Sequence, residues 1–216
     1  MSQIITYYLV LIARGMVFIL IIRFFTSIKK HNFMKIVNIF KYIPVYSKKI
    51  SRLFKVKHRS EIVWNELIKL HKKENWHFGQ YDNEKYVRAT FTDENNNDLN
   101  FHYQVTDDKL VFRAVIVSDF SEDYTNDIMV LSSHLNSLLT FGMVRVNIKD
   151  NYVEFVYQGD LLVYMLYPGE IHSDIDRHFR ITSDCYWAFT HLLNSGDEPV
   201  FVISELLKRN EKRSQA

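Results

Sequence analysis

The chain has 216 residues, of which 47% are hydrophobic and 15% aromatic, enough for one packed domain with an appendage. Its 3 Pro and 6 Gly exclude a low-complexity chain, and its single cysteine excludes an internal disulfide. Residues 1–60 contain 12 of the 27 Lys and Arg and no acid, which leaves 15 basic against 25 acidic residues in the remainder, a net charge of −10. A basic segment joined to an acidic body indicates local contact with an anionic surface, and nucleic-acid binding is not expected.

The first predicted element is the apolar segment 4–25, which as a helix is long enough to span a bilayer core of about 30 Å. Arg14 near its centre costs about 2.5–3.5 kcal/mol on insertion scales. Each central Ile, Leu, Val or Phe returns roughly 0.3–0.6 kcal/mol, and these four types make up most of the segment. Residues 1–33 are therefore expected to be a transmembrane anchor with a basic flank.

The basic residues that flank the segment predict the orientation of this anchor in the membrane. Basic residues follow the apolar segment and none precedes it, which is the reverse of a signal peptide and places the C-terminal body in the cytoplasm. We expect a single-pass protein of the inner (cytoplasmic) membrane. The alternative is an interfacial or buried helix, with translation starting at Met34. In the membrane, Arg14 either pairs with a partner helix or reaches the interface by snorkelling.

Residues 34–59 are predicted to form a basic amphipathic juxtamembrane segment, whose three-and-four apolar spacing is interrupted at Pro44. Such a segment suits an anionic membrane surface, where each basic residue contributes about 1 kcal/mol. A charged stalk that only satisfies the topology rule is the alternative. The candidate membrane-surface residues are Lys41, Lys48, Lys49, Arg52, Lys55 and Lys57.

The third part, residues 60–216, is predicted to be an α+β domain, because helical periodicity alternates with strand periodicity along it. The expected elements are a helix from Ser60 to about Trp76, strands at 85–91, 99–105 and 109–117, a helix at 123–141 capped by Gly142, strands at 143–148 and 151–158, a further strand or extended run at 161–167, a helix from Thr182 or Ser183 to Leu193, and a last helix from Pro199. This order, α-βββ-α-ββ(β)-α, indicates one antiparallel sheet with helices packed on one face.

The stretch 132–162, SSHLNSLLTFGMVRVNIKDNYVEFVYQGDLL, resembles the central helix-to-hairpin passage of YbjN-like domains. In that family a helix with a Leu-Asn pair ends at a Gly and leads into a strand hairpin, and Leu135-Asn136 and Gly142 stand at these positions. The element order over about residues 60–210 also matches. The resemblance implies the fold of type III secretion chaperones, which bind extended protein segments and commonly dimerise. The N-terminal anchor departs from the soluble pattern of that family.

Catalytic chemistry has weak support in the sequence. No phosphate-binding Gly-rich loop, GxSxG or HExxH motif is present, and no cofactor is expected. The run HSDIDRH supplies the alternative function, a metal-dependent hydrolase using His172, Asp174, Asp176 and His178, although a solvated loop entering a helix explains the run equally well. Cys185 lies in the aromatic run CYWAF and is expected in the core.

The sequence as a whole predicts a membrane-anchored, cytoplasm-facing protein-interaction module, chaperone-like or a regulatory adaptor, and not an enzyme. It would bind a protein partner through a strand edge or through a groove between sheet and helix, and it could pair as a homodimer. Aromatic residues of the predicted strands are the candidate partner contacts, although core packing is the competing interpretation of each. They are Phe101, Tyr103, Phe112, Phe155, Tyr157, Tyr164 and Tyr167.

Overall fold

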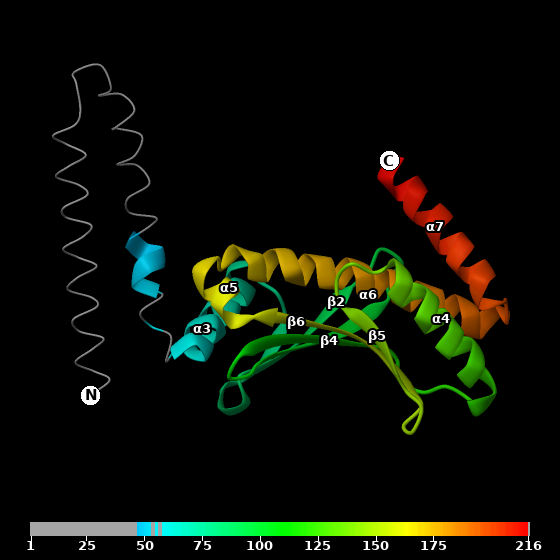
Figure 1. Cartoon of the computed structure of the whole chain (residues 1–216), viewed down its shortest axis with the longest axis horizontal. Coiled ribbons are helices and arrows are strands. Elements are labelled where there is room, and N and C mark those ends of the chain that lie inside the picture. Colours follow the sequence, from blue (N-terminus) through cyan, green and yellow to red (C-terminus); the bar gives the residue numbers. More distant parts are fainter. Residues whose placement is uncertain (1–46, 53–54, 56–57, 216) are drawn as a thin grey trace, which may run out of the picture. The chain divides into compact units, whose positions relative to one another are not determined.

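Two compact units make up the chain, Met1–Ser51 and Arg52–Ala216. The computed structural model describes residues 47–52, 55 and 58–215 (Figure 1). In the first unit, the described residues 47–51 are helical. The predicted transmembrane anchor, with Arg14, lies outside the described residues. Among the residues that are described, no helix combines the length and the apolar character needed to cross a membrane.

The second unit contains a six-stranded antiparallel sheet with the strand order β1-β2-β3-β4-β6-β5. The strands are β1 (Phe78–Tyr81), β2 (Tyr86–Thr92), β3 (Asp98–Val105), β4 (Lys109–Val117), β5 (Met143–Asn147) and β6 (Tyr152–Asp160). The predicted meander of three strands is confirmed as β2, β3 and β4. The short edge strand β1 was not predicted, because its four residues FGQY are mostly exposed and show no alternation.

Five helices are described between Arg59 and Gln215. They are α3 (Arg59–Lys73), α4 (Thr125–Leu138), α5 (Leu161–Leu166), α6 (Gly169–Ser195) and α7 (Pro199–Gln215), with short 3-10 turns η3 (Asp82–Glu84) and η4 (Glu122–Tyr124). Figure 1 shows α6 running along the strands, with α3 and α5 near its beginning and α4 and α7 near its end.

The core lies on one face of the sheet. Leu99, Phe101, Tyr103 and Val105 of β3 all point to this face and are buried, whereas the residues between them are not. One cluster packs this face against α3, α5 and the first half of α6, and a second packs it against α4, α7 and the second half of α6. The expected α+β architecture with helices on one face is therefore confirmed, and the opposite face has no helix among the described elements.

Two predicted elements are wrong. The run 161–167 was expected to be a strand or an extended run, but Leu161–Leu166 form α5. The side chain of Asp160 accepts a hydrogen bond from the Leu162 N–H (2.7 Å) and starts this helix. The helix expected from Thr182 or Ser183 is the second half of α6, which begins at Gly169. The run HSDIDRH is therefore inside a helix and not in a loop.

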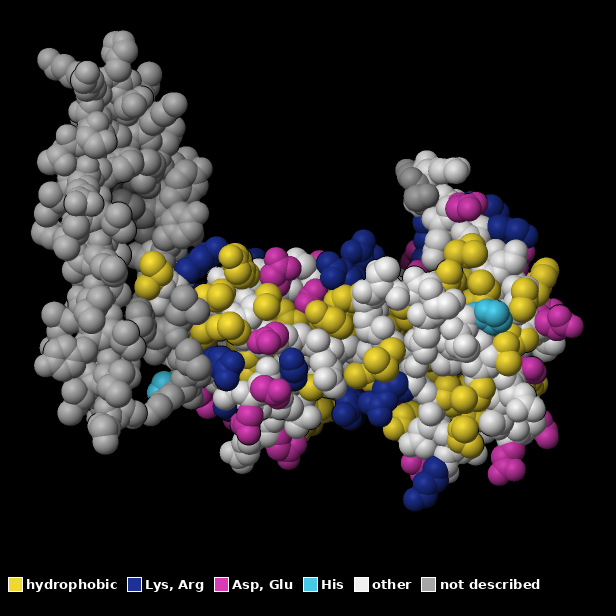
Figure 2. All heavy atoms as spheres, viewed as in Figure 1, with side chains coloured by type: hydrophobic (Ala, Val, Ile, Leu, Met, Phe, Trp, Pro, Cys, Tyr) yellow, Lys and Arg dark blue, Asp and Glu magenta, His cyan; other side chains and the backbone are white. Residues whose placement is uncertain are grey.

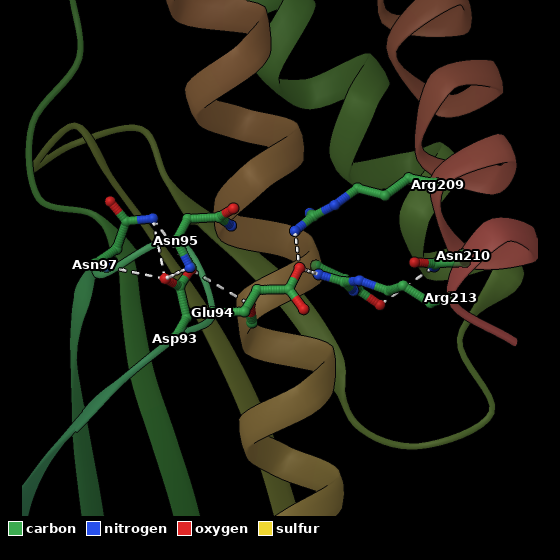
Figure 3. A network of polar contacts seen from close by, with 9 residues as sticks. Asp93, Glu94, Asn95, Asn97, Arg209, Asn210 and Arg213 are labelled. Atoms are coloured by element: carbon green, nitrogen blue, oxygen red, sulfur yellow. Dashed lines mark hydrogen bonds and ion pairs between the residues drawn. The ribbon is translucent and has the colours of Figure 1, made fainter. Parts of the chain in front are cut away.

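The hairpin turn between β2 and β3 is tied to α7 by charged side chains (Figure 3). Asp93 is buried and organises the turn by accepting hydrogen bonds from the N–H groups of Asn95 (2.8 Å) and Asn97 (2.9 Å). Glu94 points outward and pairs with Arg209 (2.6 Å) and with Arg213. These contacts join residues more than one hundred positions apart and fix the C-terminal helix to the sheet.

Figure 2 shows apolar side chains gathered over α4 and α7. On these two helices, which pack against each other, six large apolar side chains are exposed: Met129, Val130, Leu138, Val200, Phe201 and Leu207. We refer to this set as the α4–α7 surface. Exposed apolar side chains gathered on two adjacent helices are a candidate interaction site.

Candidate functional site

Strand β6 has an unpaired edge over its last residues. β5 pairs only with Tyr152–Val156, and the strand on the other side, β4, continues to pair as far as Asp160. Residues 157–160 therefore have a strand neighbour on one side and none on the other among the described residues. A free strand edge offers main-chain donors and acceptors to another extended segment.

The direction of the main-chain groups at this edge follows from two contacts. The carbonyl oxygen of Val156 points toward β5, because a Cβ built at Gly142, on the β5 side, would lie only 2.8 Å from it. Val156 therefore directs its main-chain polar groups toward β5. On the other side, the Leu161 N–H donates to the Asp108 carbonyl at 3.3 Å. Because alternate strand residues share a direction, Gln158 directs its N–H and C=O toward the open edge.

A groove of about 370 Å³ lies beside this edge, between β6, α5 and the first turns of α6. Its lining combines aromatic rings with both signs of charge. The lining residues are Tyr157, Gly159, Asp160, Val163, Tyr164, Tyr167, Glu170, Asp174 and Arg177. Three of the seven aromatic residues predicted as partner contacts are in this set.

A buried hydrogen bond forms the floor of the groove. The hydroxyl of Tyr164 donates to Oδ2 of Asp174 at 2.6 Å, and both side chains are buried. Arg177 lies 3.5 Å from the other carboxylate oxygen of Asp174. Burial, reinforced by the hydrogen bond to Asp174, raises the pKa of Tyr164 well above its ordinary value. The phenol therefore stays protonated and remains a donor to Asp174.

Gly159 is required for this arrangement. A Cβ at this position would lie 1.8 Å from the hydroxyl oxygen of Tyr164 and 2.3 Å from the nearest carbon of its ring, Cζ. No side chain larger than hydrogen fits between the strand and the ring. Glycine inside a strand is thus explained here by the close approach of another group to the backbone.

Two of the lining residues, Tyr157 and Arg177, both contact the ring of Phe141. The ring of Phe141 stacks on that of Tyr157 with a centroid distance of 3.7 Å, and the guanidinium of Arg177 lies over Phe141 at 4.8 Å. Burial, followed by the charge of Asp174, raises the pKa of Tyr157. These contacts hold Arg177 at the mouth of the groove, where it can donate to a bound segment.

The neighbouring edge, that of β5, is closed by a side chain. Asn136 of α4 donates its Nδ2 to the Val144 carbonyl (2.9 Å) and accepts the Val144 N–H on its Oδ1 (2.8 Å). The amide thus replaces the strand that would otherwise pair there. Gly142, the other residue singled out by the resemblance, has a φ of +69° and lies against Phe155. It does not cap α4, whose C-cap is Leu139, but it turns the chain into β5.

The predicted partner contacts divide between core and surface. Five of the seven are buried in the core, although Tyr164 also lines the floor of the groove: Phe101, Tyr103, Phe112, Phe155 and Tyr164. Tyr157 is partly buried, and Tyr167 is 50% exposed at the groove. Core packing therefore explains most of these seven aromatic residues, because side chains that alternate along a strand point to the face of the sheet that the helices cover.

The four residues of the predicted metal cluster do not converge. His178 is fully buried, whereas the side chain of His172 is 42% exposed and faces Asp176 at 3.5 Å. Asp174 is bound to Tyr164. The four residues follow one another at every second position of α6, and side chains two positions apart in a helix point about 200° apart. Neighbouring members of the run therefore point to opposite sides of the helix. Among the described residues, no group of three His, Cys, Asp or Glu is arranged to hold a metal ion.

Of the predicted membrane-surface residues, Arg52 contacts residues of α5 and α3. Its guanidinium donates to the Met165 carbonyl (2.9 Å) and pairs with Glu66 (3.2 Å). Lys48 and Lys55 are exposed and Lys49 is partly buried, while Lys41 and Lys57 lie outside the described residues. Cys185 is 1% exposed, as expected for a core residue, and burial raises the pKa of its thiol.

Comparison with known proteins finds similarity among solved structures. No family model matches the chain, and no curated protein matches its sequence. The chain is similar to the crystal structure of YbjN from E. coli, with a TM-score of 0.44 and 15% identity, over 60% of this chain and 93% of that one. The similarity concerns the fold, and membership of the YbjN-like family stays a prediction.

Proposed function

We propose that the chain is a membrane-anchored, cytoplasm-facing protein-interaction module, chaperone-like or a regulatory adaptor, which holds an extended segment of a protein partner beside β6. The observation that carries this proposal is the coincidence of a free strand edge at residues 157–160 with a groove of about 370 Å³. Strand addition at such an edge supplies affinity through main-chain hydrogen bonds, and adjacent pockets supply specificity.

The charges of the groove indicate the kind of segment. Three carboxylates, Asp160, Glu170 and Asp174, line it against one guanidinium, that of Arg177. Because Arg177 already faces Asp174, the outer two carboxylates are left to meet the ligand. We therefore expect an extended segment that carries basic side chains, in line with the acidic character of the whole body.

A proline at position 158 tests the proposal. Gln158→Pro removes the N–H that points to the open edge, while the hydrogen bonds to β4 come from the residues on either side. We expect crosslinking pull-down from membranes to recover the partner with the native chain and with the Gln158→Ala control, and to lose it with Gln158→Pro. Undiminished recovery with Gln158→Pro would contradict strand addition at this edge.

Membrane anchoring rests on the apolar segment 4–25 and on the basic residues that follow it. Alkaline extraction of membranes tests it by comparing the native chain with a chain that starts at Met34. We expect the native chain to stay in the membrane pellet and the shortened chain to be released. Release of both would contradict the anchor. Arg14→Leu with unchanged assembly would favour snorkelling over a partner helix.

A non-catalytic role is part of the proposal, and a metal-dependent hydrolase is the competing function. The hydrolase would need His172, Asp174, Asp176 and His178 to meet at one ion, whereas α6 directs them to different surroundings. Elemental analysis of the purified protein, together with alanine variants of the four residues, separates the two. A bound metal lost in these variants would favour the hydrolase.

Self-association is proposed through the α4–α7 surface, because it carries six exposed large apolar side chains on two adjacent helices. The double variant Val130→Glu/Phe201→Glu should convert a dimer into a monomer in light scattering of the purified protein. Val115→Glu, on the face of the sheet without helices, is the matched control and should leave the dimer intact. A mass unaffected by the double variant would contradict this interface.

A further inference from the structure

The face of the sheet opposite the core carries a row of cationic side chains. Arg88 of β2 lies directly opposite His102 of β3, which lies directly opposite Arg113 of β4. Because neighbouring strands are about 4.8 Å apart, the two arginine backbones are separated by about 10 Å with His102 between them. Both arginines are exposed and His102 is partly buried.

These arginines have no acidic partner. Among the described residues, neither Arg88 nor Arg113 forms an ion pair, whereas Arg145 on the same face pairs with Glu154 at 3.6 Å. Arg88 and Arg113 lie on either side of strand β3, and their like charges repel each other across it. Stability alone therefore does not account for the row, and an anion between the guanidinium groups would relieve the repulsion.

Aromatic rings stand next to this row. The hydroxyl of Tyr86 is hydrogen-bonded to Nδ1 of His102, and the two rings stack at 5.7 Å with an interplanar angle of 17°. The ring of Tyr81, on β1, lies 5.5 Å from that of Tyr86 and is 51% exposed. Tyr86 and Arg88 are two residues apart on one strand, so their backbones are about 6.6 Å apart on the same face.

We propose that this face of the sheet binds a nucleotide, with its phosphate between the guanidinium groups of Arg88 and Arg113 and its base on the ring of Tyr81. Guanidinium groups bind phosphate oxygens through charge-assisted, often bidentate hydrogen bonds. A flat base stacks on an exposed aromatic ring irrespective of its identity. Strand β1, which carries Tyr81, is two strands from β3, about 10 Å, and a nucleotide extended across β2 would span this distance from its phosphate to its base.

The charge of the site fits one phosphate group and not a polyanion. Two guanidinium groups match a single phosphate dianion, while the body of the chain, with 15 basic and 25 acidic residues, repels a nucleic-acid strand or an anionic bilayer. Burial, followed by the charges of Arg88 and Arg113, lowers the pKa of His102. Glu84, in η3, acts on the neighbouring Tyr86.

Titration calorimetry of the purified full-length protein with AMP tests the site. We expect binding that weakens about tenfold or more in Arg88→Ala and in Arg113→Ala, as for hydrogen bonds to charged groups, and about tenfold in Tyr81→Ala. Arg145→Ala is the matched control, because it removes a cation from the same face that is already paired, and it should bind AMP as the native chain does.

Two further ligands distinguish the binding of a nucleotide from the binding of phosphate alone and from the binding of a nucleic-acid strand. Inorganic phosphate should bind more weakly than AMP; equal affinity would overturn the contact of the base with Tyr81. Oligothymidylate that bound more tightly than AMP would overturn the assignment in favour of a nucleic-acid strand. Absence of AMP binding, or binding unchanged in both arginine variants, would overturn the site altogether.

A second measurement reports on the position of the phosphate. Bound phosphate between Arg88 and Arg113 offsets their charge, so AMP should raise the pKa of His102 in an NMR titration of the histidine ring signals. No movement of the His102 pKa on saturation with AMP would place the ligand elsewhere and overturn the proposal. The site is on the face opposite the groove at β6, so its failure would leave the protein-binding proposal intact.

Discussion

His178 is a histidine enclosed in aromatic rings at the centre of the body. It lies on α6, is 0% exposed, and its ring is 5.2 Å from that of Phe101 and 5.3 Å from that of Phe155. Burial lowers its pKa to about 3, with the backbone of Phe155 acting in the opposite direction. The folded protein therefore contains a neutral His178 at every pH above about 3.

This burial makes the stability of the fold depend on pH. In the unfolded chain a histidine takes up a proton near pH 6.5, so between that pH and about 3 the unfolded state binds one proton more than the folded state. Stability then falls as the pH falls, by about 1.4 kcal/mol per pH unit. From pH 7.5 to pH 4.5, His178 should lower the free energy of unfolding by about 3 kcal/mol.

Replacement of the histidine isolates its contribution. His178→Met fills the cavity with an apolar side chain that does not titrate, so its free energy of unfolding should fall by about 3 kcal/mol less than that of the native protein between pH 7.5 and pH 4.5. Urea unfolding followed by tryptophan fluorescence measures this, because the 3 Trp of the chain, Trp64, Trp76 and Trp187, all lie in the unit Arg52–Ala216.

The matched control is His172→Met on the same helix, whose side chain is 42% exposed. It should retain the pH dependence of the native protein. Carboxylates that titrate in this range, and the buried His71, contribute equally to all three proteins and cancel in the comparison. An identical loss of stability in the native protein and in His178→Met would refute the reasoning that burial keeps His178 neutral.

Three further substitutions test the supports of the groove and of α7. Gly159→Ala should displace the ring of Tyr164 and lower the free energy of unfolding by about 1–3 kcal/mol in urea titration. Asn136→Ala removes both hydrogen bonds to Val144; we expect a loss of about 2 kcal/mol, together with faster aggregation in light scattering because the β5 edge is opened. Glu94→Gln should lower the melting temperature at low salt and leave it unchanged at about 1 M salt, where charges are screened within about 3 Å.

The sequence predicts the sheet well where alternation is clean. Leu99 to Val105 alternate without interruption, and the strands on either side are joined by turns too short for crossovers, so the meander was identified with its correct direction. The first half of α6 was missed because two buried polar residues, Asp174 and His178, interrupt its apolar stripe. The run 161–167 was misread because its apolar residues suit a strand until Asp160 is recognised as a helix cap.

The candidate sites were predicted less well, for a physical reason. Aromatic residues in an alternating strand point to the covered face, so the same pattern that reveals the strand hides its aromatic side chains in the core. The groove depends on the difference in length between β5 and β6 and on Gly159, and neither has a local signature. The row of Arg88, His102 and Arg113 takes one residue from each of three strands. Only the register of the sheet brings them together.

Site-specific photocrosslinking in membranes tests the central claim, that the groove beside β6 binds a protein partner, most directly. A benzophenone amino acid at Val163, an exposed residue of the groove wall, should crosslink to a defined protein, and the crosslink should disappear when Gln158→Pro is added. The same group at Val115, exposed on the opposite face of the sheet, should give no such product. A product formed equally from both positions, or one that persists with Gln158→Pro, would contradict binding of the partner at this edge.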